Sequence, residues 1–319
     1  MEQSLRANGK LLLTGEYFVL DGVPGLAVPT RLGQTLGISE VSGDELRWEA
    51  RAADGSTWFA ATMGRGRWMR SADKAAGEVA SPEDRLVQLL AAAEALSPDC
   101  TDFLPGHRIV TRLEFDRAWG LGSSSTLVAC LARLLGVNPY ALLERTFGGS
   151  GYDLACAVHN TPILYERKGP VITPLPWRPA WADQSVFVYR NQKQNSREGI
   201  RRYRNAKITD TVRREITDIT TAFSSLTLDL RTAAELLAYH ERLVAETLGL
   251  QPVQEELFPD FPGQLKSLGA WGGDFLWVLS ELDPEKTRAY FNARGYPTVI
   301  SYDWMVLPLP ADADPADQP

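Results

Sequence analysis

The stretch WGLGSSSTL, residues 119–127, restricts the possible fold of this chain more than any other segment. Residues 107–115 before it (HRIVTRLEF) alternate between polar and apolar, which predicts a strand, and the apolar spacing after it predicts a long helix over residues 121–135. Two glycines and three serines add nothing to a hydrophobic core, so they predict a tight turn that opens this helix. The first turn of a helix has unpaired N–H groups and a partial positive charge. This order of elements is therefore typical of an anion site.

Two interpretations of that turn stay open on its own residues. In one, Gly120 and Gly122 let the backbone approach a phosphate, and the serine hydroxyls add donors or a metal ligand. In the other, a serine caps the helix after a tight turn, because short glycine motifs also match by chance. The common nucleotide signatures are absent: Gly9-Lys10 is followed by leucine, and a serine stands where GxGxxG would have its third glycine.

Composition excludes several classes of function. The 319 residues suit one or two domains, and the formal net charge of −7 argues against a general nucleic-acid binder. Cys100, Cys130 and Cys156 form no CxxC pair and suit a reducing compartment. We find no signal-peptide pattern and no apolar run long enough to span a bilayer, so we expect a cytoplasmic protein with no membrane partner. The oligomeric state is not readable from the sequence.

The pattern of elements predicts an α+β fold. The first third alternates short apolar runs with turn residues, which is typical of antiparallel strands. Further strands are expected at residues 162–165, 185–189, 275–279 and 298–302, and helices at 82–96 (with Ser81 as N-cap), 139–145, 209–223, 231–248 and 284–293. Strands and helices do not alternate as βαβ units, which favours α+β. The proline-rich stretch at residues 170–181 predicts a domain boundary, giving domains 1–175 and 176–310, and the acidic residues 311–319 predict a disordered tail.

Four segments together carry a resemblance to a known superfamily. They are ANGKLLLTGEYFVLDGVPGLAVP, WGLGSSSTL, GGSGYDLACAVHNTPILYER and LKSLGAWGGDFLWVLS, in this order over residues 7–280. In type and order they resemble the motif set of the GHMP small-molecule kinases. The resemblance implies a two-domain fold, with a ribosomal-protein-like N-terminal domain and a ferredoxin-like C-terminal domain. It also implies ATP and Mg²⁺ as cofactors and a small-molecule phosphate acceptor as partner.

The details resemble the phosphomevalonate kinase and mevalonate kinase branch. GEY at residues 15–17, the GSGYDLACA block and GAWGGD at 269–274 are similar to the phosphomevalonate kinase forms. The chain departs from the pattern at Asn8 (usually proline), at Thr126 (usually alanine) and at Trp271 (usually a small residue), which suits a distinct subfamily. The resemblance implies phosphomevalonate as the acceptor, within isoprenoid precursor synthesis. Mevalonate or another small alcohol is the alternative.

The resemblance also assigns roles in phosphoryl transfer. It implies a phosphate cradle formed by Gly120, Leu121, Gly122, Ser123, Ser124 and Ser125, with Mg²⁺ held by Ser124 and Glu144. Asp153 would act as base or orienting group beside the acceptor hydroxyl, and Lys10 would keep that carboxylate ionised and stabilise the transferring group. The structural alternatives are a turn aspartate after Gly151, a surface lysine, and a glutamate on a solvated helix face.

Acceptor binding is implied for three further groups of residues. They are Glu16 with Ser150 and Gly151; Lys193, Ser196 and Arg197 in the polar turn after a strand; and Gly272, Gly273 and Asp274 in the third glycine loop. A lysine, a serine and an arginine within one turn suit a carboxylate or phosphate, although a solvated basic helix start explains them equally well.

Two other functions on the same fold stay open. A diphosphomevalonate decarboxylase-like lyase also uses ATP, but its motifs differ from GSGYDLACA and GAWGGD. A catalytically silent binding protein would be expected to lose Lys10, Asp153 or the serine loop, and this chain keeps all three.

Overall fold

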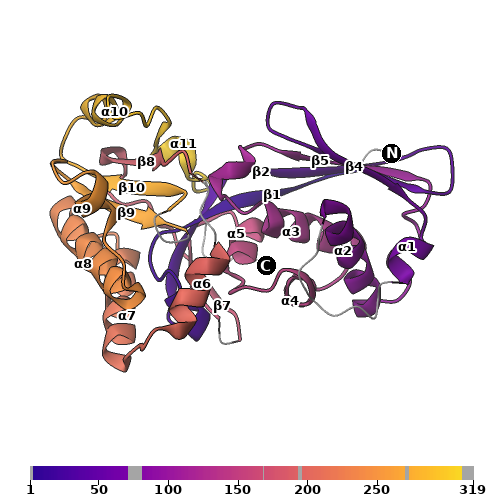
Figure 1. The fold of residues 1–319 in the computed structure, drawn as a ribbon, viewed down its shortest axis with the longest axis horizontal. Coiled ribbons are helices and arrows are strands. Elements are labelled where there is room, and N and C mark those ends of the chain that lie inside the picture. The colour runs from indigo at the N-terminus through magenta and orange to yellow at the C-terminus, as the bar shows by residue number, and fades with distance from the viewer. Residues whose placement is uncertain (1–2, 71–80, 168, 193–195, 270–272, 311–319) are drawn as a thin grey trace. The chain divides into compact units, whose positions relative to one another are not determined.

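The computed structural model describes residues 3–70, 81–167, 169–192, 196–269 and 273–310 (Figure 1). These residues form two compact units. Unit 1 holds residues 1–9, 32–117 and 121–158, and unit 2 holds 10–31, 118–120 and 159–319. The units interleave along the chain, and the proline-rich stretch near residue 175 lies within unit 2. The division into domains 1–175 and 176–310 stays a prediction, and the tail 311–319 lies outside the described residues.

Unit 1 is built on one end of a mixed sheet. Its strands run in the order β4-β3-β5-β2, where β2 is Gly25–Glu40, β3 Leu46–Arg51, β4 Thr57–Met63 and β5 His107–Leu113, and β1 (Gln3–Leu12) pairs with β2. β3 pairs antiparallel with β4, and β2 with β5, as the alternating pattern predicts. β3 and β5, however, are parallel. The long connection between β4 and β5, which contains α1 and α2, lets the chain return in the same direction as β3.

Helices of unit 1 cover one face of these strands (Figure 1). They are α1 Gly66–Met69, α2 Pro82–Leu96, α3 Ser123–Leu135, α4 Pro139–Thr146 and α5 Tyr152–Val158, preceded at α3 by the short 3₁₀ turn η2 Arg117–Trp119. The expected N-cap of α2 is present, because Ser81 Oγ accepts from Asp84 N at 3.1 Å. α3 begins within two residues of its predicted start and ends at Leu135 before Gly136, whose left-handed backbone (φ +66°) suits a helix C-cap.

Unit 2 contains the other end of the first sheet and a second sheet. β6 (Ile163–Glu166) pairs with residues 25–27 of β2 and with β7 (Val171–Pro174), both antiparallel. The second sheet is antiparallel in the order β11-β8-β10-β9, formed by β8 Ser185–Tyr189, β9 Gln264–Leu268, β10 Phe275–Leu279 and β11 Val299–Ser301. Its helices are α6 Ser196–Asn205, α7 Asp210–Ser224, α8 Leu230–Leu248, α9 Val253–Leu257, α10 Pro284–Asn292 and α11 Tyr302–Met305, with 3₁₀ turns η1 Phe18–Asp21 and η3 Ala182–Gln184.

The proline-rich stretch is packed structure and not an open linker. Its start forms β7 at the end of the first sheet, where a proline removes no ladder hydrogen bond that an inner strand would need. Trp177 and Trp181 are buried, and their indole N–H groups donate to Phe223 O at 2.6 Å and Leu228 O at 2.9 Å. Aromatic side chains with paired N–H groups stabilise a core, so this segment contributes buried side chains to the core of unit 2.

Several elements differ from the sequence pattern, among them the short elements α1, β7 and α9. α5 occupies residues that read as a turn, β9 has a lysine at its centre, and the run expected to continue as a strand through residues 14–20 bends into η1. In the described part of the chain, no helix combines the length and the apolar character needed to cross a membrane.

Candidate functional site

The glycine-serine loop has the backbone that its composition predicts. Gly120 (φ +66°) and Gly122 (φ +92°) are both left-handed, a conformation that side chains disfavour. Gly122 is the N-cap of α3 and offers no side chain, so no cap hydrogen bond occupies the first-turn N–H groups. The loop therefore leaves a helix N-terminus available to an anion.

Within unit 2, a lysine and an aspartate converge on the first glycine of this loop. Lys10 Nζ donates to Gly120 O at 2.9 Å. A Cβ built on Gly120 would lie 1.9 Å from Asp274 Oδ2, so only glycine fits against this carboxylate. Asp274 is 8% exposed and follows Gly273, which is also left-handed (φ +67°). The first, second and fourth motifs thus meet in unit 2, where a cation and a carboxylate flank the start of the loop.

The hydroxyls after Gly122 divide into two kinds. Ser125 Oγ donates to Gly122 O at 2.9 Å, and Thr126 Oγ1 donates to Gln34 Oε1 at 2.7 Å; both side chains are buried and hold the turn. Ser123 and Ser124 are half-buried, and among the described residues the structure gives their hydroxyls no hydrogen-bond partner. These two hydroxyls are the ones that a ligand can reach.

Two carboxylates of unit 1 lie on helices that pack against α3. Asp153 is half-buried in the first turn of α5, directly after Gly151 (φ +91°) and Ser150. Glu144 is exposed on α4. Because α3 contacts both α4 and α5, the elements that carry Ser124, Asp153 and Glu144 form one helical cluster. Lys10 belongs to unit 2, so its predicted pairing with Asp153 stays a prediction.

Some of the residues predicted to bind the acceptor lie outside the part of the chain that the structure describes. Lys193, Gly272 and Trp271 lie outside the described residues. Ser196 and Arg197 are the first two residues of α6, so the predicted helix start is present there.

Glu16 lies in the interior of unit 2. It is 4% exposed and forms an ion pair with Lys266 Nζ, which is 1% exposed and also donates to Ser267 O at 3.0 Å. Burial raises the pKa of Glu16 to about 7 against the opposing effect of the Lys266 cation. The residue predicted to contact substrate therefore has its carboxylate engaged inside the protein.

The surroundings of this ion pair are also polar and buried. Gly15 N donates to His240 Nε2 at 2.9 Å, so the imidazole accepts at that nitrogen, and burial holds the pKa of His240 well below its usual value. Glu241 accepts from Ser267 N and Oγ at 3.2 and 2.7 Å, and burial raises the pKa of this carboxyl.

A second carboxylate cluster, in unit 1, is bridged by one arginine. Glu94, Asp99 and Asp102 place one oxygen each within 4.8 Å of one another, but Arg65 forms ion pairs with all three. Glu94 also accepts from Thr101 Oγ1, which is a structural use of its charge. This cluster ties α2 to the loop after it.

Comparison with known proteins identifies the fold. No family model matches the sequence, and no curated protein matches it. Among solved structures, *Streptococcus pneumoniae* phosphomevalonate kinase in complex with phosphomevalonate and AMPPNP is similar with a TM-score of 0.68 and 18% identity, covering 94% of this chain and 99% of that one. This chain has the GHMP kinase fold.

Other enzymes with the GHMP kinase fold are equally similar. *Methanococcus jannaschii* mevalonate kinase has a TM-score of 0.67 at 12% identity, covering 92% of this chain and 95% of that one. *Lactococcus lactis* galactokinase complexed with galactose has a TM-score of 0.67 at 14% identity, covering 96% and 93%. The α+β, GHMP kinase-like fold expected from the motifs is confirmed. Identities this low establish the fold and do not distinguish among acceptors.

The sequence motifs do not identify the buried polar side chains that surround Glu16. Lys266 lies within the fourth motif segment, and His240 and Glu241 are neighbours on an amphipathic helix, but the sequence does not show which buried groups these side chains contact. The one available signal is Lys266 at the centre of QLKSL, since a lysine inside an otherwise buried strand requires a partner.

Proposed function

We propose that this chain is an ATP-dependent phosphotransferase that phosphorylates a small acidic acceptor, with phosphomevalonate as the acceptor and mevalonate as the alternative. The observation that carries the proposal is the start of α3: two left-handed glycines precede a helix N-terminus without a side-chain cap, and Lys10 is bonded to the loop. An anion site of this kind, with a cation attached to it, suits the phosphates of ATP.

The loop residues bind the phosphates in this proposal. Backbone N–H groups of residues 122–125 donate to phosphate oxygens, and the reachable hydroxyls of Ser123 and Ser124 add donors. Lys10, positioned by Gly120 O, contributes a compact cation that stabilises negative charge on the transferring group. The residue that Lys10 contacts and the N-cap of α3 are close neighbours in the chain, because only Leu121 separates Gly120 from Gly122.

The residues of unit 1 fit a magnesium ion. Mg²⁺ prefers oxygen ligands and keeps several waters, so one hydroxyl and one carboxylate suffice. Ser124 offers a half-buried hydroxyl and Glu144 an exposed carboxylate, on helices that pack together. Bound there, the ion neutralises charge on the phosphates that ATP brings.

Asp153 has the catalytic role in this proposal. Its carboxylate accepts the proton of the acceptor hydroxyl, or orients that hydroxyl, as attack on the γ-phosphorus proceeds. Its place in the first turn of α5 supports the role, because α5 packs against α3, whose first turn carries the proposed phosphate-binding residues.

Phosphomevalonate needs a second anion site, which Lys193, Ser196 and Arg197 would supply near the start of α6. A helix N-terminus and two cations suit a phosphate or carboxylate. Support comes from the GSGYDLACA block and from the similar fold of a phosphomevalonate kinase that binds phosphomevalonate. Ser150, Gly151, Gly272, Gly273 and Asp274 complete the proposed acceptor contacts.

A coupled ADP-release assay tests the proposal. Mevalonate, phosphomevalonate, homoserine and sugars are each supplied with MgATP, and we expect turnover to be fastest with phosphomevalonate. Replacement of two charged donors in Lys193→Ala/Arg197→Ala should raise the KM for phosphomevalonate by at least about 100-fold, because each charged hydrogen bond contributes roughly 1.5–3 kcal/mol. The matched control is Arg202→Ala/Arg204→Ala, which removes two exposed cations from the same helix.

The assay tests the identity of the acceptor and the kinase activity separately. A preference for mevalonate that the Lys193→Ala/Arg197→Ala change leaves untouched contradicts the acceptor and keeps the kinase. Absence of ADP release with every acceptor contradicts the kinase itself.

A further inference from the structure

The segment TGEY, residues 14–17, is attached to a different element of unit 2 at each of its residues. We call it the TGEY loop. Thr14 Oγ1 accepts from Thr220 Oγ1 of α7 at 2.9 Å, and Gly15 N donates to His240 Nε2 of α8 at 2.9 Å. Glu16 pairs with Lys266 of β9, and the Tyr17 ring stacks on Tyr203 of α6 with centroids 5.8 Å apart. A displacement of this loop would therefore reach α6, α7, α8 and β9.

The contact with α6 is closely fitted. Tyr17 has a positive φ (+61°), which is unfavourable for a residue with a side chain. A Cβ built on Gly199 of α6 would lie 2.2 Å from Tyr17 Oη, so the phenol occupies the space that this glycine leaves. Tyr203 also packs edge-on against Phe18, with centroids 5.3 Å apart. The conformation of Tyr17 therefore sets where the first turns of α6 lie.

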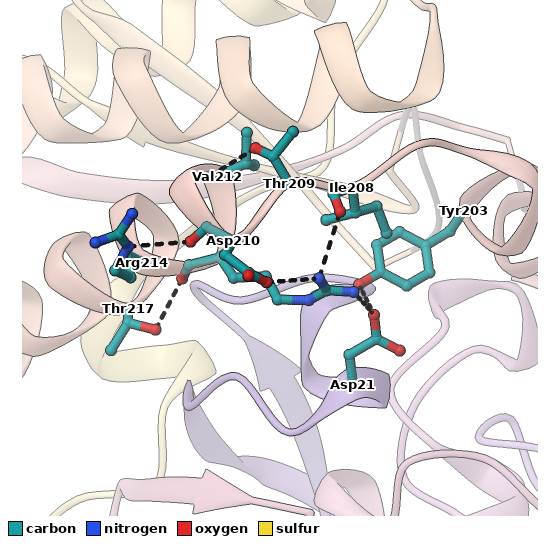
Figure 2. Close-up of polar contacts among 9 residues, drawn as sticks. Asp21, Tyr203, Ile208, Thr209, Asp210, Val212, Arg214 and Thr217 are labelled. Atoms are coloured by element: carbon teal, nitrogen blue, oxygen red, sulfur yellow. Dashed lines mark hydrogen bonds and ion pairs between the residues drawn. The ribbon is translucent and has the colours of Figure 1, made fainter.

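A polar network fixes the hydroxyl of Tyr203, the residue of α6 that stacks on Tyr17. Tyr203 Oη donates to Asp21 Oδ2 at 3.0 Å, and Arg213 Nη2 of α7 donates to the same oxygen at 2.8 Å. Figure 2 shows Asp21, Tyr203 and the residues that open α7 around this contact. α6 is thus joined to η1 on one side and to α7 on the other, with the TGEY loop leading directly into η1.

The anchor of the loop is the ion pair inside unit 2. Lys266 is the cation next to Glu16, and its strand packs against α8, which carries His240 and Glu241. Among the described residues, Glu16 Oε2 has no hydrogen-bond partner, and it lies 3.5 Å from His240 Nε2, which already accepts from Gly15 N. The carboxylate consequently depends on Lys266 for its position.

We propose that Lys266 is a positioning residue for acceptor binding. It holds Glu16, Glu16 fixes the backbone of Tyr17, and Tyr17 with Tyr203 sets the position of the first turns of α6. This inference rests on the proposed function, in which α6 opens at the acceptor's anionic group. It assigns acceptor affinity to a residue that does not touch the acceptor.

The test compares Lys266→Met with the parent and with Lys286→Met, which removes an exposed lysine from α10. Steady-state kinetics should show at least a tenfold rise in the acceptor KM for Lys266→Met, with the KM for MgATP unchanged. Lys286→Met should leave both values at the parent level. A purely structural role for Lys266 would instead lower kcat with the folded fraction and leave both KM values unchanged, which overturns the proposal.

A second variant covers the case in which an unpaired Glu16 prevents folding. Glu16→Gln/Lys266→Met removes both charges, so neither is left uncompensated. It also lacks the ion pair, so its acceptor KM should stay raised. A return of the acceptor KM to the parent value in this double variant contradicts the inference.

Hydrogen exchange separates this inference from the kinase proposal. Amides of residues 199–205 should exchange at least tenfold faster in Glu16→Gln/Lys266→Met than in the parent, with amides of α10 unchanged. Unchanged exchange in α6 overturns the inference, whether or not the parent turns over any acceptor. If exchange in α6 is faster in the double variant while the parent turns over no acceptor, the mechanical link is supported and only the proposed function is contradicted.

Discussion

Two loops of this chain start from the same kind of glycine and use their polar groups in opposite ways. Gly15 (φ +84°) and Gly120 (φ +66°) are both left-handed. In the TGEY loop, the polar groups of residues 14–16 bond to other elements of unit 2. In the glycine-serine loop, α3 begins without a side-chain cap, and the Ser123 and Ser124 hydroxyls are half-buried.

The difference separates a binding loop from a scaffold loop. A buried polar group is unfavourable unless it is paired, so the TGEY loop can exist only with its partners in place. The glycine-serine loop keeps its donors accessible, and a ligand can satisfy them. Changes in the first loop should therefore act on stability and, through α6, on acceptor affinity, whereas changes near the second should act on turnover.

The largest expected effect is on turnover, at Asp153. Asp153→Asn keeps the shape of the side chain and removes the carboxylate, so kcat should fall by about 10² to 10⁴-fold, the usual contribution of a general base. The melting temperature should stay at the parent value, because the residue is half-buried and not part of the core. Asp44→Asn, at an exposed position of the same unit, is the control. Parent-level turnover would remove Asp153 from the mechanism.

The next effect is on stability, at the start of the TGEY loop. Gly15→Ala places a Cβ 2.8 Å from Pro24 O in a left-handed backbone. The conformation costs about 1–2 kcal/mol and the overlap about 1–3, so the free energy of unfolding should fall by roughly 2–5 kcal/mol. Gly136→Ala is the matched control, because that glycine is equally left-handed but has open space. Equal losses measured by denaturant unfolding would contradict the close fit of the loop.

A pH-dependent effect should appear at Glu16. Its folded-state pKa of about 7 lies above the ordinary 4.5, so the folded chain holds a proton that the unfolded chain has released between these values. The stability from this group is full below pH 4.5 and is lost as the pH rises through 7. The unfolding free energy of the parent, relative to that of Glu16→Gln, should therefore fall by about 2–3 kcal/mol from about pH 5 to about pH 8.

Comparing the unfolding free energies of the parent and Glu16→Gln separates the titration of Glu16 from that of its neighbours. Glu241 titrates in the same direction, and His240 in the opposite one, since burial lowers the pKa of the imidazole. Both contributions are shared by the parent and the variant. A difference that does not change with pH would show that Glu16 is ionised throughout.

The smallest expected effect belongs to Ser124. Ser124→Ala should lower kcat/KM for MgATP by about tenfold, or roughly 1.4 kcal/mol, because water can replace one hydroxyl in the shell of Mg²⁺. The unfolding free energy should not change. Ser125→Ala is the informative control, because that buried hydroxyl holds Gly122 and its loss should reduce stability instead. If Ser124→Ala lowered stability and Ser125→Ala lowered kcat/KM for MgATP, Ser125 would be the ligand-binding residue and Ser124 the structural one.

Local rules explain what the sequence predicts correctly. The end of α3 at Leu135, the Ser81 cap of α2 and the bounds of α8 to within one residue follow from side-chain spacing and from glycine and serine chemistry. Those rules involve residues a few positions apart, which the sequence displays directly. The motif order likewise predicts the fold that the similar structures confirm.

Only the tertiary structure shows how residues distant in sequence are used. The sequence by itself determined the glycine-serine loop at the head of α3, because that feature depends on neighbouring residues. It did not determine that Glu16 pairs with Lys266, 250 positions away, or that Asp274 lies against Gly120. A buried charge acquires its role from the partner that folding brings to it, and no local spacing encodes that partner.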